Sequence, residues 1–518
     1  MPLYSTPGVY VGESQLTSLT QPATGPTAAV FLGEAPRGPV GPTLVTDWPT
    51  FKLQFGDLDN AYDLCYSVYH YFANGGRSAY VIRVLGAAST ANSSASGASI
   101  GLYDGGASVA LGTFAANSPG AWGNGIKLTV AQGAVTASSA AKPTFNLAVS
   151  LSGTEVEQWK ELAVDENSNR YFVEMINRYS KFISVSAPAS YTYSTVAPAS
   201  GASFIATAIT DRTMTGGSAT SPTTTTYSGA SGIDLIDTIQ GNLIINAVGL
   251  TDTTAINLLA AKCKTRGDSF LIVDPKLTDT TQAMNASTVG AITGSTAPGY
   301  MSIYTPCLEM VDPLKTGLGA ARTTFPGGAV AGVFVRTELA RSVAKAPAGY
   351  DCTIVGALGI SVKYTDSQVG AMYDAAVQSN SFKAIPGAGV AIMGARTVEK
   401  VNPDRFVPVR RTLNYVKRSV KDIAAAYVFE PNDANLWIKL NNDISNFLNN
   451  FWRSGGLKGA RSSDAFFVVC DKTNNTASSI DQGIVNVSIG IAVTYPAEFI
   501  VINVSQWTGG SNAVEINL

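Results

Sequence analysis

The chain has 518 residues, of which 45% are hydrophobic and only 14% are charged, and its formal net charge at pH 7 is −2. This charge balance excludes a basic face for nucleic acid, because no run of Lys and Arg is long enough to form one. The length predicts roughly three or four domains of about 150 residues each, and the fifty glycines favour a turn-rich, strand-rich protein over a helical bundle.

The cysteines and the apolar segments limit the class of protein further. The five cysteines are widely spaced and form no Cys-x-x-Cys pair, so neither a disulfide framework nor a zinc site is indicated. The N-terminus lacks the basic region and apolar core of a signal peptide, and no stretch approaches about 18 uninterrupted apolar residues. We therefore expect a soluble protein with buried free thiols, made in a cytoplasm.

Both ends of the chain predict extended arms, at residues 1–22 and 506–518. Each arm holds a short strand pattern, formed by Gly8, Val9, Tyr10 and Val11 in the first and by Ala513, Val514, Glu515 and Ile516 in the second. Neither pattern has an obvious hairpin partner nearby. Termini fray unless they are tied down, and an open strand edge favours pairing with another chain. What these two strands pair with stays open at this point.

Residues 23–86 predict the first part of an α/β core. A buried strand at 27–33 and a strand at 78–84 flank an amphipathic helix at 61–72.

Residues 87–231 predict a β-rich inserted domain. This segment is rich in Ala, Ser, Thr and Gly, with strands at 126–132 and 144–151 and a helical pattern at 171–179. A disordered linker is the alternative for 184–232, which is poor in charge, but its Tyr and Ile residues favour strands.

Residues 232–350 predict an α/β middle domain. The apolar runs at 242–250 and 269–275 lack alternation, as expected for parallel strands buried on both faces. Asp274 lies at the end of the second run, where α/β enzymes often place catalytic groups. Because no second carboxylate, His or Lys stands beside it in sequence, we interpret Asp274 as a turn residue.

Residues 351–505 predict a C-terminal α/β domain. Asn432 or Asp433 is an N-cap signal for an amphipathic helix that ends before Gly455. Strands follow at 465–471, 484–493 and 498–504, and the alternation in 484–493 indicates a sheet with one buried face.

The sequence contains no recognisable catalytic, cofactor-binding or metal-ligating constellation. His70 is the only histidine, which excludes two-histidine metal motifs and limits triad chemistry. The letters GASIG at 97–101 match a nucleophile motif but lack the strand before and the helix after that the motif requires. We therefore predict a non-enzyme without a cofactor.

Ten motifs, taken in chain order, carry a family resemblance. They are PGVYVGE (7–13), AAVFLGEAPRGPVGPTLVTDWPTFKLQFG (28–56), YFANGGRSAYVIRV (71–84), SPGAWGN (118–124), GGAVAGVFVRTELARSVAKAPAG (327–349), MGARTV (393–398), PVRRTLNYVKRSV (408–420), FEPNDANLW (429–437), FFVVCDKTNNT (466–476) and PAEFIV (496–501). Their number and order resemble contractile tail sheath proteins of bacteriophages. Ala344 departs from the pattern, since the family has a large aromatic residue there.

The resemblance implies an α+β multidomain fold, with an α/β core of mixed sheets, a β-rich insertion and extended terminal arms. It also implies a virion tail component, assembled in the host cytoplasm, that forms stacked hexameric rings around a tube and contracts to drive the tube through the host envelope. The implied partners are further copies of the chain, the tail tube protein, and baseplate and tail terminator proteins. Neither direct nucleic-acid contact nor membrane insertion is implied.

The resemblance also suggests where neighbouring subunits meet. In this family the arms add strands to a small sheet in a neighbour's C-terminal domain, and that domain faces the tube. Candidate residues of the acceptor sheet are Val485, Val487, Ile489, Phe499 and Val501. Candidate tube-facing residues are Lys439, Asn442 and Asn446, for which an ordinary solvated helix face is the alternative.

Two other functions stay open at this point. One is the sheath of a contractile bacteriocin or injection system, which the sequence does not separate from a phage sheath. The other is a tail-associated hydrolase, which would need a titratable cluster that the lone His70 and the sparse charge do not supply.

Overall fold

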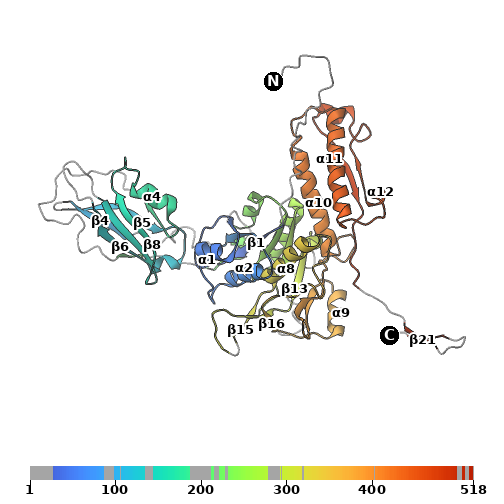
Figure 1. Ribbon diagram of the computed structural model, residues 1–518, viewed down its shortest axis with the longest axis horizontal. Helices are drawn as coiled ribbons and strands as arrows, with labels where there is room; N and C mark the ends of the chain where they lie inside the picture. Colours follow the sequence, from blue (N-terminus) through green and yellow to red (C-terminus); the bar gives the residue numbers. More distant parts are fainter. Residues whose placement is uncertain are drawn as a thin grey trace, which may run out of the picture.

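The computed structural model describes residues 27–86, 98–104, 107–134, 144–186, 212–214, 221–227, 232–277, 292, 295–317, 320–401, 403–498, 504–507 and 513–516. The architecture is α+β and multidomain, as predicted. A β-rich unit lies at one end of the molecule, a mixed sheet covered by helices lies in the middle, and a pair of long helices projects at the other end (Figure 1).

The centre of the molecule is an eight-stranded sheet with the order β18-β17-β13-β12-β11-β1-β3-β2. Its strands are β1 (Ala28–Gly33), β2 (Thr43–Val45), β3 (Ala79–Arg83), β11 (Leu243–Ala247), β12 (Ser269–Val273), β13 (Met301–Thr305), β17 (Asn380–Ile385) and β18 (Gly389–Ile392). The six inner strands run parallel, and only the edge strands β2 and β18 are antiparallel to their neighbours. The four apolar runs predicted as strands of the core are confirmed.

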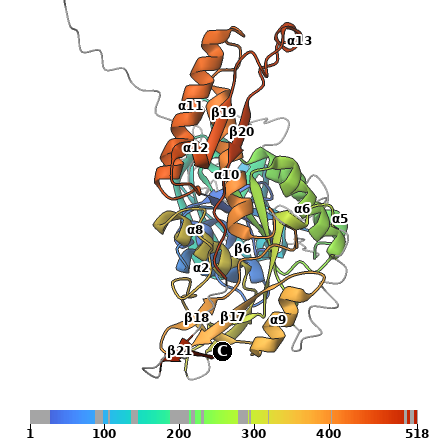
Figure 2. The ribbon, with the colours of Figure 1, turned by 90° about the vertical axis from the view of Figure 1, so that its right-hand side faces the viewer.

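Helices cover both faces of this sheet (Figure 2). The helices α1 (Trp48–Phe55), α2 (Asp63–Ala73) and α8 (Gly327–Ala340) share one hydrophobic core, and α6 (Thr253–Arg266) belongs to the core on the opposite face. Two glycines of α8, Gly328 and Gly332, let this helix approach α2 closely. A Cβ atom on Gly328 would lie 2.1 Å from the carbonyl oxygen of Ser67, so no larger residue fits there without moving the backbone of one helix.

The predicted boundary at residue 351 is wrong, because it divides strands that the structure joins. The strands β17 and β18 follow that boundary but pair with the central sheet. The strand β16 (Ala357–Ile360) likewise pairs with β14 (Leu308–Val311), which also pairs with β15 (Ala321–Thr324). The helix α9 (Asp366–Asp374) packs beside β17. These pairings connect segments far apart in the chain, which local patterns do not reveal.

The inserted segment contains two sheets around one separate core. One sheet has β4 (Ala98–Asp104), β5 (Ala107–Ala116) and β9 (Ile183–Ser186), and the other has β6 (Ile126–Gln132), β7 (Thr144–Leu151), β8 (Thr154–Ala163) and β10 (Arg212–Thr213). The helix α4 (Phe172–Tyr179) packs Phe172 against this core. The strands expected at 126–132 and 144–151 and the helical pattern at 171–179 are therefore confirmed, whereas most of the stretch 184–232 lies outside the described residues.

The projecting unit is a helical hairpin backed by a small sheet. Its helices are α10 (Val407–Ala425), α11 (Ala434–Arg453), α12 (Ser462–Ala465) and α13 (Ala477–Asp481), and its strands are β19 (Phe466–Val469) and β20 (Ser488–Ile491). Asp433 caps α11 as predicted, since its carboxylate accepts a hydrogen bond from the Leu436 N–H at 2.9 Å. The two strands lie beside α10 and α11 (Figure 2).

Buried charges on α10 join this hairpin to the central sheet. Arg411 pairs with Glu338 of α8 and lies over the Phe334 ring at 5.1 Å. Arg418 reaches Asp268, next to β12, at 3.5 Å, and the Asn414 side chain donates to the Ser269 carbonyl oxygen at 2.9 Å. The first half of α10 thus has polar partners on two elements of the core.

Asp274 is a buried structural carboxylate and not an exposed turn residue. It accepts hydrogen bonds from the Gly327 N–H at 2.7 Å, the Asn246 side chain at 3.0 Å and the Gly249 N–H at 3.3 Å. It therefore links the ends of β11 and β12 to the first residue of α8. Burial raises the pKa of Asp274 to about 6, against an ordinary value of 3.8.

This shift predicts a pH dependence of stability. Because the folded state binds the Asp274 proton more tightly than the unfolded state, lowering the pH through about 6 should stabilise the fold. Between about pH 7 and about pH 4 the free energy of unfolding should rise by about 2–3 kcal/mol more in the wild type than in Asp274→Asn, measured by urea titration. As a control, Asp433→Asn removes a carboxylate whose pKa is lowered by its hydrogen bond from Leu436. Here the free energy of unfolding should fall with decreasing pH by more in the wild type than in the variant, which is the opposite sign. Equal pH profiles for Asp274→Asn and wild type would contradict this account.

Candidate inter-subunit surfaces

The single histidine of the chain lies in the interior of the fold. His70 is buried in α2, and burial lowers the pKa of its imidazole to about 4. Within the described ranges, no group of three His, Cys, Asp or Glu residues could hold a metal ion, and no helix there has the length and apolar character to span a bilayer. Of the GASIG letters, Gly97 lies outside the described residues and the others fall within β4.

The carboxyl ends of β1 and β11 form the position where open α/β sheets usually bind ligands, because the connections diverge there. Glu34, Asp63 and Asp252 line a cavity of about 460 Å³ at this position. Asp252 caps α6 by accepting from the Ala255 N–H at 2.8 Å, and Asp63 pairs with Arg322 at 2.8 Å. Burial raises the pKa of Glu34, to which the Ser221 side chain is hydrogen-bonded. Two of these three carboxylates therefore have structural roles.

The C-terminal arm forms a β-hairpin. The strand β22 (Ala513–Ile516) pairs antiparallel with β21 (Val504–Trp507), with Val514 opposite Gln506. The expectation that this strand has no hairpin partner nearby is therefore wrong. The two strands form a sheet of their own, and two-stranded hairpins are marginally stable in water. The N-terminal strand pattern at Gly8–Val11 lies outside the described residues.

A second two-stranded sheet lies on the helical hairpin. Phe466 and Val468 of β19 and Ile489 and Ile491 of β20 pack against the core between α10 and α11. On the opposite face, Phe467 is 59% exposed. Its ring covers Gly490, where a Cβ atom would lie only 2.1 Å from a ring atom. One face of this sheet is thus buried, and the other presents an aromatic side chain.

The two edges of this sheet differ. The Val468 carbonyl oxygen accepts from the Asn441 side chain at 3.2 Å, so the outer edge of β19 is partly covered by α11. Val468 lies opposite Ile489, and the alternation of an antiparallel ladder therefore directs the backbone groups of Ile489 away from β19. Within the described residues, β20 pairs with no strand other than β19. This edge of β20 has the geometry to accept another strand.

The predicted acceptor residues only partly coincide with this sheet. Ile489 lies in β20, but Val485 and Val487 precede it, so the strand expected at 484–493 is shorter than predicted. Val485 and Val487 are partly buried against a core formed by Leu436, Trp437 and Leu440. Their alternation therefore reflects packing on α11 and not pairing in a ladder. Phe499 and Val501 lie outside the described residues.

The outer face of α11 is polar and exposed. Lys439, Asn442 and Asn446 all lie on it, opposite the buried stripe of Leu440, Ile444 and Leu448. Ile438, 59% exposed, lies beside them. The structure brings the three predicted residues together on one face, and their contact with a tube stays a prediction.

An ion pair between a buried arginine and a partly exposed glutamate lies where the chain leaves the fold toward the C-terminal arm. The Arg396 Nε atom lies 3.2 and 3.0 Å from the two carboxylate oxygens of Glu498. Arg396 is only 3% exposed and lies 4.0 Å over the Tyr373 ring, whose hydroxyl donates to the Met393 carbonyl oxygen at 2.9 Å. Sequence reasoning missed this pair. The motifs at 393–398 and 496–501 contained both residues, but 102 positions separate them.

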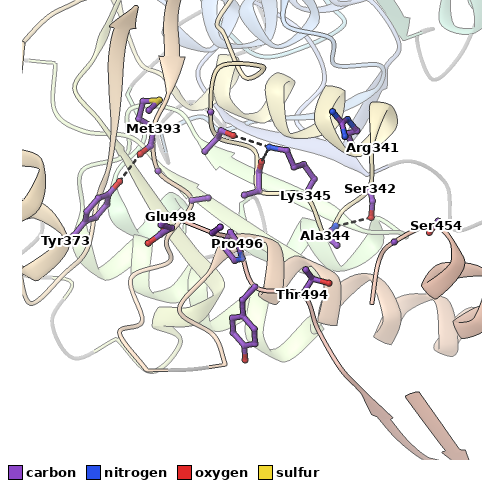
Figure 3. A pocket seen from close by; sticks show the side chains of 18 residues that line it. Arg341, Ser342, Ala344, Lys345, Tyr373, Met393, Ser454, Thr494, Pro496 and Glu498 are labelled. Carbon is purple, nitrogen blue, oxygen red and sulfur yellow. Dashed lines mark hydrogen bonds between the residues drawn. The ribbon is translucent and has the colours of Figure 1, made fainter. Parts of the chain in front are cut away.

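A cavity of about 660 Å³ adjoins this ion pair, and we name it the arm-root pocket. Figure 3 shows Tyr373 and Glu498 on one side of it and Arg341 and Ser342 on the other. Much of the lining consists of small residues, namely Ala344, Ala346, Ala348, Gly349, Gly394, Ala395, Gly455 and Ala497. The pocket is therefore open because the side chains around it are short.

Comparisons with known proteins show that the chain is similar to phage tail sheath proteins. Residues 401–506 match the family model of the phage tail sheath C-terminal domain. Over 191 residues the chain is 27% identical to the tail sheath protein of Vibrio phage KVP40, which covers 36% of this chain and 27% of that relative. Over 155 residues it is 28% identical to the tail sheath protein of Enterobacteria phage T4, which covers 30% of this chain and 22% of that relative. The chain thus spans about a quarter of the length of these curated relatives.

The whole fold is shared with a solved sheath. The chain resembles the sheath of an extracellular contractile injection system, PVC, in its contracted state, with a TM-score of 0.57 and 20% identity. The match covers 98% of this chain and 99% of that chain, and at this identity it shows a common fold. The predicted resemblance to contractile tail sheath proteins is confirmed at the level of the C-terminal domain and of the fold.

The Arg396–Glu498 pair yields a direct test. Glu498→Ala should lower the free energy of unfolding by about 3–5 kcal/mol, because it leaves a buried guanidinium without its counter-ion. It should also speed limited proteolysis beyond residue 498, since the root of the arm loses its anchor. Lys383→Ala is the matched control, because it breaks a pair with Asp366 in which both side chains are exposed, and it should cost less than about 1 kcal/mol. Equal effects in the two variants would contradict the anchoring role.

Proposed function

We propose that this chain is the structural subunit of a contractile tail sheath. Copies of it polymerise as stacked hexameric rings around an inner tail tube, and contraction of the rings drives the tube through a host envelope. The observation that carries this proposal is a sheath-protein fold, shared over 98% of the chain, whose last described segments form two sheets of two strands each.

Strand exchange between terminal arms would link the subunits. A donor strand of a few residues forms backbone hydrogen bonds that contribute about 0.5–1.5 kcal/mol each, while ordering the arm costs about 1–2 kcal/mol per residue. One arm therefore binds marginally, whereas many arms in a closed mesh act together. The open edge of β20 and the hairpin of β21 and β22 are the described elements that support this arrangement.

The energy for movement would come from burial and not from hydrolysis. Contraction requires that the folded domains bury more complementary surface in the short state than in the long state, with a kinetic barrier holding the long state. We infer that the chain has no enzymatic activity and needs no cofactor. This inference is supported by the structural roles of Asp252 and Asp63 at the position where an α/β enzyme would bind its substrate.

The proposed partners are the tail tube protein, baseplate and tail terminator proteins, and other copies of the chain. The proposed location is the tail of a virion that is assembled in the host cytoplasm. The sheath of an injection system is the second candidate, because the shared fold includes such a sheath. Capsid and portal genes beside the gene for this chain would favour the phage tail.

Loss of either arm should abolish polymerisation without unfolding the subunit. Chains that lack residues 1–12 or 506–518 should keep the thermal stability of the wild type but form no striated cylinders in electron micrographs. A finer test replaces Val514 in β22. Val514→Pro removes a backbone N–H and should act like the deletion, whereas the control Val514→Thr keeps a β-branched residue and should assemble. If the deleted chains form cylinders, the proposed strand exchange between terminal arms is wrong.

The exposed face of α11 should bind the tube. Lys439→Glu should leave sheath polymerisation intact but reduce co-sedimentation with purified tube protein by at least fivefold, because it reverses the charge at the centre of this face. Lys439→Arg keeps the charge and should bind normally. Unchanged tube binding by Lys439→Glu would show that this face is an ordinary solvated surface.

A further inference from the structure

The loop between α10 and α11 presents an aromatic side chain to solvent from a strained backbone. Phe429 is fully exposed, with a relative exposure of 102%. Its φ is 74°, in the left-handed region that bulky residues rarely adopt. The preceding residue, Val428, is 60% exposed. Strain of this kind persists where the surrounding structure imposes it, often at contact sites, and an exposed ring gains nothing from burial in the free subunit.

This loop tip also carries a negative charge. Glu430 is exposed and directly follows Phe429. In the part of the chain that the structure describes, no cation pairs with the Glu430 carboxylate, whereas the nearby Asp443 accepts a hydrogen bond from the Tyr427 hydroxyl. The tip therefore combines two apolar side chains with one carboxylate that has no counter-ion.

The arm-root pocket has complementary properties. Its small lining residues leave space for an apolar insertion of more than one side chain. Two of its charged residues already have partners, since Lys345 lies 3.6 Å from Asp351 and Glu498 pairs with Arg396. Arg341 lies on the wall of the pocket and is exposed, and no acid among the described residues pairs with it. The pocket therefore offers a cavity lined largely by small side chains, with one available cation.

We propose that the Phe429 tip of one copy inserts into the arm-root pocket of a second copy, with Glu430 facing Arg341. This contact rests on the proposed function, because it requires copies that assemble. The occupant comes from another copy because α11, whose 20 residues span about 30 Å, separates the tip from the pocket at its other end. Ser454 and Gly455, which follow α11, line the pocket.

The contact joins two different surfaces of the chain. One contact uses the tip of one copy and the pocket of another, and it leaves one pocket and one tip free. Repeated head to tail, such a contact generates a ring or an open helical filament, as the proposed sheath requires. An aromatic side chain buried in a preformed pocket is also the usual anchor of an interface. The contact thus adds a second link between subunits, which is independent of the arms.

Disulfide cross-linking tests the contact in the full-length chain. A variant with Phe429→Cys and Ala344→Cys should give a ladder of covalent oligomers when assembled cylinders are oxidised, and the ladder should collapse to monomer on reduction. The five native cysteines are all buried, so the wild type and each single variant should give no ladder. Cylinders of the double variant that yield only monomer would overturn the proposal.

Substitutions test the energetics of the same contact. Phe429→Ser should raise the critical concentration for polymerisation at least tenfold, and so should Ala344→Trp, which fills the pocket from within its own chain. Leu358→Ser removes an apolar residue of β16 that is 60% exposed and should have no effect. Glu430→Arg and Arg341→Glu should each weaken assembly, and combining them should restore it. Failure of the combined variant to recover would count against the ion pair and the docking pose.

The outcomes separate this contact from the proposed function. A wild type that forms no cylinders would overturn the sheath assignment, and the contact with it. Normal cylinders from Phe429→Ser, together with no ladder, would overturn only the contact. Normal cylinders from Phe429→Ser that no longer bind tube protein would assign the tip to the tube and overturn its docking into a second copy.

Discussion

The ion pairs that seat α10 on the central sheet determine where every candidate surface of this protein lies. Arg411 pairs with Glu338, and Arg418 pairs with Asp268. Buried pairs of this kind contribute little net stability compared with apolar residues, but loss of one partner is costly. The helix therefore has one favourable position, since any shift along its axis would separate several charges at once. The position of α10 in turn sets the position of the rest of the hairpin, including β19, β20 and the exposed face of α11.

The central sheet is complete within the subunit, whereas the last described strands form smaller sheets. The central sheet has eight strands, two covered faces and edges formed by short antiparallel strands. By contrast, the sheets of β19 with β20 and of β21 with β22 have two strands each, and the first of them is stabilised by its packing against α10 and α11. Thr27, the first described residue, donates to Glu338, so the start of the described chain shares its anchor with α10. The elements closest to the chain ends are thus the ones that gain most from a neighbour.

The sequence reveals elements whose stability is local and misses those that depend on distant partners. The helix α11 is evident because Asp433 caps it and apolar residues recur along one face. The strand β11 is evident as a continuous apolar run. The membership of β17 in the central sheet depends on its pairing with β13, which lies far away in the chain, and no local pattern encodes that pairing.

The candidate surfaces show the same limit more strongly. The alternation of Val485 and Val487 predicts a strand, but their burial on α11 produces the same period without a ladder. The Arg396–Glu498 pair joins residues that have no sequence relation to each other. The exposure and positive φ of Phe429 are properties of the folded loop and cannot be read from the amino-acid sequence. The family motifs contain Arg396, Phe429 and Glu498 without indicating what each one contacts.

The five buried thiols determine how the subunit responds to oxidants. Burial raises the pKa of Cys65 and raises that of Cys263 to about 12, so the reactive thiolate form is scarce at neutral pH. None of the five cysteines is joined to another, and the subunit therefore gains nothing from oxidants and loses little to them. The covalent structure of the subunit is therefore the same in reducing and in oxidising surroundings. A sheath of the proposed kind would hold its long state by packing alone, whatever the redox potential outside.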